Sequence, residues 1–240
     1  MIDWLITLAC SVSGVCDHQA CRRIEHEQVS HVVCSYRMED VSVSLRSMRA
    51  DGTPYRTLRA AMEDAGPSLM AMNGGMYHED LGPVGLYIEN GTEQKAISTR
   101  GGWGNFHLLP NGVFWGRGGR YYVTETSAYR KRQPKPDFAT QSGPMLVIDG
   151  KLHPRFLEES NSRKIRNGVG VSAEGEWLHF GISEGFVTFH EFGRLFRDQL
   201  DCHNALFLDG SISAIRTQKY RQGGWRDLGP IIVVTSRKKD

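Results

Sequence analysis

The stretch Ala205-Leu206-Phe207-Leu208-Asp209-Gly210-Ser211-Ile212-Ser213 decides the fold, because four apolar residues lead directly into an acid, a glycine and hydroxyl-bearing residues. A run this short and this apolar, bounded by a turn signal, predicts a strand covered on both faces. Gly210 then permits a sharp change of backbone direction. We therefore expect Asp209 at the rim of the core, where partial desolvation makes a carboxylate chemically useful. The alternative is a strand followed by an Asx-type turn that caps itself.

The composition favours one globular domain. A chain of 240 residues has room for one large domain or two small ones, and no interval has the Pro and Ser content of a linker. The 29 basic and 27 acidic residues are interspersed and give a net charge of +2, so no basic face and no nucleic-acid partner are expected. Gly accounts for 27 residues and clusters with Asn and Asp, which indicates many tight turns between short strands.

The N-terminal segment differs from the rest of the chain. From Ile2 to Val15 it is apolar or small with Asp3 as its one charge, and polar residues follow. We interpret residues 1–15 as the remnant of an export signal and 16–240 as the domain, which predicts a periplasmic or extracellular protein. The run is too short and too interrupted for a stable membrane span. The alternative is a buried first strand or helix.

The cysteines also bear on whether the protein is exported. If the leader is cleaved near Gly14, four of the five remain, and Cys21 and Cys34 could be joined across a local loop. Such a pair would suit an oxidising compartment. The spacing CxxC does not occur, so no metal site is predicted. The five are Cys10, Cys16, Cys21, Cys34 and Cys202.

Two segments predict helices. Thr53 is expected to cap the first, with Pro54 at its first position and Gly66 at its end. Thr188 and Glu191 have the spacing of a capping box at the start of the second.

Short apolar or alternating runs predict many strands. Two hairpins are expected among them, one through residues 38–40 and one through 110–112. The α+β class therefore follows, as a single domain with a mixed, largely antiparallel β-sheet and a few flanking helices. The predicted strands cover 29–37, 41–45, 68–72, 84–89, 106–109, 113–115, 121–126, 145–148, 169–172, 177–182, 205–208 and 231–234.

Polar turns rich in glycine follow or adjoin several of these strands. Together they supply amide, hydroxyl and carboxylate groups on backbone that can approach a ligand closely, as a sugar or sugar phosphate requires. A basic turn enters another strand, and an Arg fork there could hold two phosphate oxygens. The stretches are Asn73-Gly74-Gly75-Met76-Tyr77-His78, Gln141-Ser142-Gly143-Pro144, Ser162-Arg163-Lys164-Ile165-Arg166-Asn167-Gly168 and Asp209-Gly210-Ser211-Ile212-Ser213.

In their order and approximate spacing these motifs resemble the phosphodiester glycosidase domain, and more specifically its small exported bacterial branch. This is the domain of the enzyme that uncovers mannose 6-phosphate on lysosomal enzymes by removing a masking N-acetylglucosamine. The resemblance runs from about Ser68 to Val234. The chain departs from the family pattern at two places: Asp-Gly-Gly is here Asp209-Gly210-Ser211, and Arg-Thr-Ala is here Arg166-Asn167-Gly168.

The resemblance implies a reaction that these residues can perform. Breaking the bond between an anomeric carbon and a phosphate releases a weakly basic group, so a strong general acid matters less than in ordinary glycoside hydrolysis. A carboxylate facing the oxocarbenium-like centre still matters. We expect Asp209 to supply it, as nucleophile, base or electrostatic partner, with Glu184 as a second carboxylate and Arg166 on the phosphate. The alternatives are a surface turn acid for Glu184 and a structural salt bridge for Arg166.

The remaining site residues are expected to bind substrate. Each lies at or beside the end of a short apolar run, so a single sheet could bring them to one rim. Gly74, Gly143 and Gly210 would form the floor, where a side chain would block the ligand. The alternative is a set of separate turns facing solvent. The expected substrate-binding residues are Asn73, Gly74, His78, Gln141, Ser142, Gly143, Gly210 and Ser213.

Two further groups of neighbouring polar residues are weaker candidates for a catalytic or metal site. The stretch His78-Glu79-Asp80 predicts a solvated loop, because three adjacent side chains cannot converge on one point; His78 is its member most suited to face a substrate. Cys202 and His203 would point to opposite faces of an extended segment, which argues against a thiol nucleophile. No P-loop, dinucleotide fingerprint, HExxH or EF-hand pattern occurs, so no cofactor is expected.

The leading functional hypothesis is a hydrolase that cleaves the sugar-phosphate bond of sugar-1-phosphodiesters in envelope polymers or masked glycans. The two departures from the family motifs motivate a rival, a non-catalytic glycan or phosphoglycan-binding envelope protein. A structural envelope protein is the third hypothesis. The oligomeric state is left open by the sequence.

Overall fold

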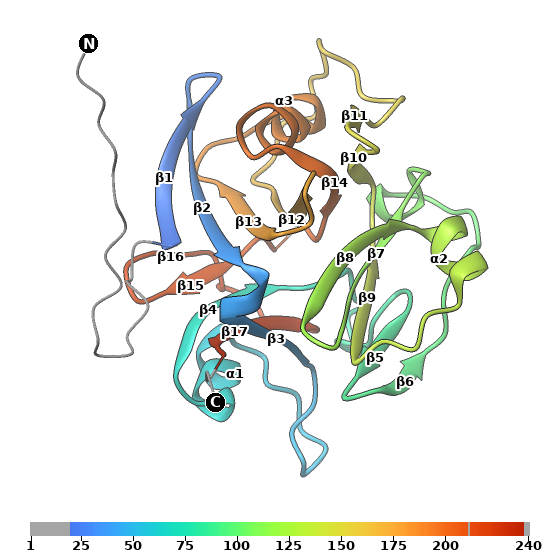
Figure 1. Cartoon of the computed structure of the whole chain (residues 1–240), viewed down its shortest axis with the longest axis vertical. Coiled ribbons are helices and arrows are strands. Elements are labelled where there is room, and N and C mark those ends of the chain that lie inside the picture. The colour runs from blue at the N-terminus through green and yellow to red at the C-terminus, as the bar shows by residue number, and fades with distance from the viewer. Residues whose placement is uncertain (1–19, 211, 238–240) are drawn as a thin grey trace.

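The computed structural model describes residues 20–210 and 212–237, and Figure 1 shows how their elements are arranged. These residues form three antiparallel β-sheets with short helices, so the predicted α+β class is confirmed, with the strands divided among three sheets instead of one. The predicted export segment, residues 1–15, lies outside the described residues. Among the described residues, no helix is both long enough and apolar enough to cross a membrane.

The large sheet has seven strands and contains the strand predicted from the opening stretch. In spatial order its strands are β1 (Cys21–His26), β2 (Val29–Arg37), β13 (Trp177–Ser183), β12 (Asn167–Ser172), β14 (Cys202–Phe207), β10 (Met145–Ile148) and β11 (Lys151–Leu152).

The second and third sheets have five strands each. The second sheet is ordered β16 (Arg221–Gln222), β15 (Ile215–Thr217), β4 (Ser68–Asn73), β17 (Ile231–Ser236) and β3 (Val41–Arg46). The third is ordered β6 (Thr92–Lys95), β5 (Tyr87–Glu89), β9 (Phe138–Ser142), β7 (Gly112–Arg117) and β8 (Arg120–Glu125).

Strand β14 lies between β12 and β10 and is covered on both faces, as predicted. Leu206 and Leu208 pack into the core that the three sheets share. Ala205 and Phe207 pack on the other side of the sheet, against the helical segment above it. The apolar run ends at Leu208. Asp209 follows it at the rim of the core, where the chain leaves the sheet, with only 8% of its surface exposed.

The helices are short and cover the sheets from outside. They are α1 (Leu58–Ala65), α2 (Thr126–Arg132) and α3 (Phe189–Arg194), the last continued by a π-helical turn (Leu195–Gln199). The capping box at the start of α3 is confirmed: the Thr188 hydroxyl accepts from the Glu191 amide at 3.1 Å, and Glu191 Oε2 accepts from the Thr188 amide at 2.8 Å. In Figure 1 α3 lies over the large sheet, against which Phe192 and Phe196 pack.

Three local predictions were wrong. Strands β2 and β3 do not form a hairpin, because the 3₁₀ turn η2 (Met38–Asp40) takes the chain from the large sheet to the second sheet. Helix α1 begins after Thr57, whose hydroxyl accepts from the Ala60 amide, and not after Thr53. No strand forms over 106–109: the 3₁₀ turn η3 (Asn105–His107) lies there, and the Asn111 side chain bonds to the Phe106 carbonyl instead of completing a hairpin turn.

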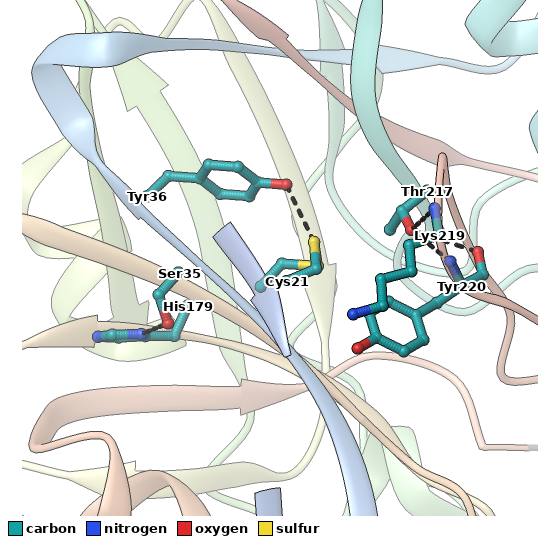
Figure 2. The surroundings of a disulfide bond; sticks show 8 residues. Cys21, Ser35, Tyr36, His179, Thr217, Lys219 and Tyr220 are labelled. Carbon is teal, nitrogen blue, oxygen red and sulfur yellow. Dashed lines mark hydrogen bonds between the residues drawn. A yellow bond between two sulfur atoms is a disulfide. The ribbon is translucent and has the colours of Figure 1, made fainter. Parts of the chain in front are cut away.

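The disulfide between Cys21 and Cys34 is present, joining residues that face one another on β1 and β2. Figure 2 shows the Tyr36 hydroxyl pointing at the Cys21 sulfur, 3.5 Å away. The bond therefore fastens the outermost strand of the large sheet to the rest of it. Of the described cysteines, Cys202 is free and buried.

Candidate active site

The ends of strands from all three sheets meet at the exit of β14. Asn73 ends β4 in the second sheet, Ser142 ends β9 in the third, and Asp209 follows β14 in the large sheet. Asn73 Nδ2 donates to the Asp209 carbonyl at 3.3 Å, and the Ser142 hydroxyl donates to the Leu208 carbonyl at 2.5 Å. The expectation that a single sheet supplies these residues was wrong, because the three come from three sheets.

Asn167, at the start of β12, is the hub of this polar network. Its Nδ2 donates to Asn73 Oδ1 at 3.0 Å, while its Oδ1 accepts from the Asp209 amide at 3.3 Å and from the Ser213 hydroxyl at 3.1 Å. Asn73 Oδ1 accepts in turn from the Ala214 amide at 2.7 Å. These bonds hold Asp209, Ser213 and Ala214, so buried side chains fix these three residues in place.

Asn167 was not predicted as a site residue, although it belongs to the basic turn and to one of the departures from the family motif. A signal was nevertheless present, since Asn167 lies two residues before the predicted strand 169–172. A buried amide side chain needs hydrogen-bond partners, and here those partners are distant in sequence.

The Asp209 carboxylate lies near the phenol of Tyr77. Burial raises the pKa of the Tyr77 hydroxyl, and the negative charge of Asp209 raises it further. The hydroxyl donates to the Asp227 carbonyl at 2.9 Å. Tyr77 is therefore a neutral hydroxyl beside the acid, and it was quoted in the Asn-Gly-Gly motif without being predicted as a site residue.

A cavity of about 530 Å³ adjoins the segment that follows Asp209. Gly210 and Ser213 line it on that side, and Lys164, Arg166 and Arg226 line it elsewhere. None of the described residues that line the cavity is acidic. The volume falls within the range of roughly 300–1,000 Å³ that is typical of ligand pockets. The cavity is therefore suited to an anion of small-molecule size.

Arg166 is buried in an unusual way, with 1% of its surface exposed. Its Nε donates to the Val187 carbonyl at 3.0 Å, its Nη2 donates to the Ser162 carbonyl at 2.8 Å, and its guanidinium lies 3.5 Å from the centre of the Phe189 ring. Among the described residues no carboxylate pairs with it, and its buried Nη1 has no hydrogen-bond partner. Burial lowers the pKa of Arg166 to about 10. The predicted alternative of a structural salt bridge is thus wrong for this arginine.

Of the predicted site residues, Arg166, Gly210 and Ser213 line the cavity, whereas Asn73, Ser142 and Asp209 lie behind them in the polar network, and Glu184 and His78 belong to neither group. Both oxygens of Glu184 accept hydrogen bonds from Arg23, and this bond is the main factor that lowers the Glu184 pKa. His78 is exposed in a turn whose backbone bonds to Gly82. The catalytic role of Glu184 and the binding role of His78 therefore stay predictions.

Gln141 is committed to contacts within the protein. Its Oε1 accepts from the amides of Leu86 and Ser98 at 3.0 and 2.9 Å, and its Nε2 donates to the Ser98 carbonyl at 2.7 Å. Its side chain is 1% exposed. In this structure Gln141 fixes the segment that begins at Ser98, and it does not face the cavity.

The glycines of the motifs are needed by the protein backbone. A Cβ at Gly143 would lie 2.5 Å from the Asn111 Cβ, and one at Gly210 would lie 2.7 Å from the Phe207 ring. At Gly74 the nearest atom, the Pro230 carbonyl oxygen, would be 3.2 Å away. Close packing of strand ends therefore requires these glycines, and the expectation that they also make room for a ligand stays a prediction.

A second cavity, of about 410 Å³, is lined by residues such as Tyr121, Asp137 and Arg237 and contains none of the predicted site residues. Within the described ranges, 20–210 and 212–237, no group of three or more His, Cys, Asp or Glu residues is placed to hold a metal ion.

Known proteins resemble this chain over most of its length. The sequence profile of the phosphodiester glycosidase family matches residues 68–235. The uncharacterized protein YigE of Escherichia coli K12 is 36% identical over 203 residues, which cover 82% of this chain and 78% of YigE.

Two solved structures share the fold. One is the catalytic domain of zebrafish N-acetylglucosamine-1-phosphodiester α-N-acetylglucosaminidase, auto-inhibited by its pro-peptide, with a TM-score of 0.62 and 16% identity over 90% of this chain and 82% of that one. The other is a Burkholderia pseudomallei protein assigned as exported, with a TM-score of 0.58 and 11% identity over 86% of this chain and 74% of that one.

Proposed function

Because the chain belongs to the phosphodiester glycosidase family, we propose that it hydrolyses sugar-1-phosphodiesters at the bond between the anomeric carbon and the phosphate oxygen. Water adds to the anomeric carbon as that bond breaks, the phosphate leaves as a monoester, and the proton of the water passes to solvent. The products are the free sugar and the phosphate monoester of whatever group the phosphate carried.

The observation that carries this proposal is the buried cation at the cavity wall. An arginine removed from water without a carboxylate partner is costly, and such sites recur where an anion binds. Lys164 and Arg226 line the same cavity, so the positive charge is concentrated there. A phosphate diester would supply the missing negative charge, and guanidinium is suited to hold two of its oxygens.

We assign the carboxylate that faces the reacting carbon to Asp209. The sugar ring develops positive charge in an oxocarbenium-like transition state, and a carboxylate stabilises that charge most where water is scarce. Asp209 is 8% exposed at the exit of β14, close to the cavity lined by its neighbour Gly210. Since the departing phosphate is weakly basic, the site needs no strong general acid.

Asn73, Ser142 and Asn167 are proposed as positioning residues. Their side chains are fully buried and bond to the backbone on either side of the Asp209 carboxylate. Such an arrangement holds the backbone that carries the charged group in place, which preorganises the site before substrate arrives.

Export to an oxidising compartment is proposed as well. The Cys21–Cys34 disulfide supports it, because structural disulfides persist in secreted and periplasmic proteins and are rare in the cytosol. The apolar segment over residues 1–15 suits an export signal. Masses of the mature protein from the periplasmic and cytoplasmic fractions, with and without reductant, test the location and the bond together.

The function is tested with a panel of sugar-1-phosphodiesters that includes the N-acetylglucosamine diester named in the zebrafish relative. The wild-type protein should release phosphomonoester, and Asp209→Asn should lower kcat by about a thousandfold, because the amide keeps the shape and loses the charge. Asp149→Asn is the matched control, since Asp149 is exposed in the turn near the other end of β14. Binding without release by the wild type would instead support the rival glycan-binding protein.

A further inference from the structure

Four planar side chains stack in a column that ends at the cavity. The Phe156 and Phe189 rings are nearly parallel, with 8° between their planes and 5.2 Å between their centres. His153 stacks on Phe156 at 4.7 Å, and the Arg166 guanidinium lies 3.5 Å from the centre of the Phe189 ring. Groups this close to one ring would overlap if they shared a face of it, so Phe156 and Arg166 cover its opposite faces. The column therefore carries on its last ring the guanidinium of an arginine that lines the cavity.

The Phe189 ring is also held from the side. The Phe207 ring meets it edge-on, with 4.9 Å between their centres and 88° between their planes. Phe207 ends β14 and is fully buried, and Phe189 begins α3 directly after the capping residue Thr188. The ring beneath the guanidinium is therefore fixed by the large sheet, by α3 and by Phe156.

The contacts of Arg166 leave one nitrogen of its guanidinium for a ligand. Nε and Nη2 donate to the Val187 and Ser162 carbonyls, whereas the buried Nη1 has no hydrogen-bond partner among the described residues. The Phe189 ring stabilises the cation through its face and accepts none of these N–H groups. A carboxylate in the same place would neutralise the charge and compete with a phosphate for the same hydrogens. An aromatic partner therefore keeps the buried guanidinium charged and available to an anion.

We propose that Phe189 is a positioning residue for Arg166. Its ring supports the guanidinium so that Nη1 donates to the phosphate of the substrate in the cavity, and Phe156 supports the ring from its other face. This inference rests on the proposed function, because it takes Arg166 as the residue that binds the phosphate. It adds the reason why a buried cation without a carboxylate partner holds one orientation before substrate arrives.

A purely structural contact is the alternative. Arginine side chains often cover apolar surface with their aliphatic stems, and Phe189 would then only fill space beside Arg166. The geometry argues against this, because the guanidinium carbon itself lies over the centre of the ring, at van der Waals distance. The charged head of the side chain, and not its stem, is what the ring supports.

The test measures the binding of inorganic phosphate by isothermal titration calorimetry. Phe189→Leu keeps an apolar side chain and removes the aromatic face, so the Kd for phosphate should rise about five- to thirtyfold. Phe189→Tyr keeps the face and should hold the Kd within about threefold of the wild type. Phe156→Leu acts one ring further away and should raise the Kd by about two- to threefold.

A spectroscopic measurement reports the orientation of the guanidinium directly. The protein is prepared with ¹⁵N-labelled arginine, and the Arg166 signals are identified by their absence from Arg166→Met. The Nη1 and Nη2 signals should be separate in the wild type and should exchange with one another at least about tenfold faster in Phe189→Leu. A ring that only filled space would leave this exchange rate unchanged.

Phe192→Leu is the matched control, because Phe192 is in the same helix and fully buried, and its ring contacts His31 and Phe196. It should bind phosphate as the wild type does, and melting temperatures should show which variants fold. If Phe189→Leu does not fold, Phe156→Leu decides by the same two measurements.

The outcomes separate this inference from the proposed function. A wild type that does not bind phosphate refutes the phosphate site at Arg166 and, with it, the role of Phe189. A wild type that binds, together with a folded Phe189→Leu that binds equally well, leaves the phosphate site standing and overturns the positioning role. A loss in Phe192→Leu as large as that in Phe189→Leu also overturns it, because the effect would then belong to the packing of α3 in general.

Discussion

Replacing Arg166 with methionine separates what this residue does for the fold from what it does for ligand binding. Burial lowers its pKa from the ordinary arginine range to about 10, which corresponds to about 3 kcal/mol against the charged form in the folded protein. The hydrogen bonds to the Val187 and Ser162 carbonyls oppose this, at about 1.5–3 kcal/mol each. Because these contributions largely cancel, and the methionine sulfur can pack on the Phe189 ring, we expect the free energy of unfolding to change by less than about 2 kcal/mol.

The effect on anion binding should be much larger. Inorganic phosphate at about 100 times its Kd stabilises the folded state by about 2.7 kcal/mol, which is roughly 5 °C or more in melting temperature for a chain of this size. Calorimetry with and without phosphate should show this rise for the wild type and none for Arg166→Met. Arg163→Met is the control, because Arg163 is in the same segment, pairs with Glu191 at 2.9 Å and does not line the cavity.

The dependence of folding stability on pH follows from the lowered pKa of Arg166. The folded pKa lies below the unfolded one, so the cost of the buried charge is fully present below pH about 10 and is relieved as the pH rises from about 10 towards the ordinary pKa of arginine. Stabilisation by phosphate requires the charged form and should disappear as the pH rises through about 10. If phosphate stabilises Arg166→Met as it does the wild type, the phosphate site lies elsewhere; a loss of more than about 4 kcal/mol without ligand would show that Arg166 is chiefly structural.

Three further variants test other parts of the structure. Asn167→Ala should lower the free energy of unfolding by about 3 kcal/mol in urea titrations and reduce kcat, since it leaves the Asp209 amide without its partner; an unchanged kcat would remove the positioning role. Glu184→Gln should keep kcat within about threefold and cost at most about 1 kcal/mol, because its ion pair with Arg23 is largely exposed; a loss as deep as that of Asp209→Asn would identify a second catalytic carboxylate. Cys34→Ser should lower stability by about 3 kcal/mol, as expected for a bond spanning 13 residues, and should make the urea midpoint insensitive to reductant.

Local sequence patterns predicted the elements whose causes are local. The opening stretch predicted β14 correctly because four consecutive apolar residues need cover on both faces wherever they lie in the fold. Thr188 and Glu191 predicted the start of α3 because a capping box satisfies amides within one turn of the chain. The Asp149-Gly150 turn similarly joins β10 to β11.

Choices among distant partners could not be predicted in the same way. Strands β2 and β3 are separated by only three residues, so a hairpin was a reasonable expectation. Each has its partner elsewhere, β13 for one and β17 for the other, because the faces they bury belong to different layers. Period-two patterns state which face of a strand is buried and not which strand lies beside it.

The site residues also divide into those that local sequence predicts and those whose roles depend on distant contacts. Asp209 could be predicted as the residue at the end of a buried strand, because its place depends on the apolar run before it. The role of Asn167 could not, because it depends on contacts with Asn73, 94 residues away, and with Asp209, 42 residues away. Arg166 was predicted to bind phosphate, but its burial over Phe189 depends on the packing of α3 and not on its own motif.

The structure also separates the positions that fix the chemistry from those that would choose the substrate. Asp209 is held through buried side chains of three sheets, so a change at Asn73 or Asn167 disturbs the acid and the fold together. Trp225 and Phe186 lie on loops, and their exposed rings contribute little to the core. Replacing either ring can therefore alter what the cavity accepts while the acid keeps its place. Under the proposed function, relatives with a preserved polar network and different rim residues should share the reaction and differ in the group that the phosphate carries.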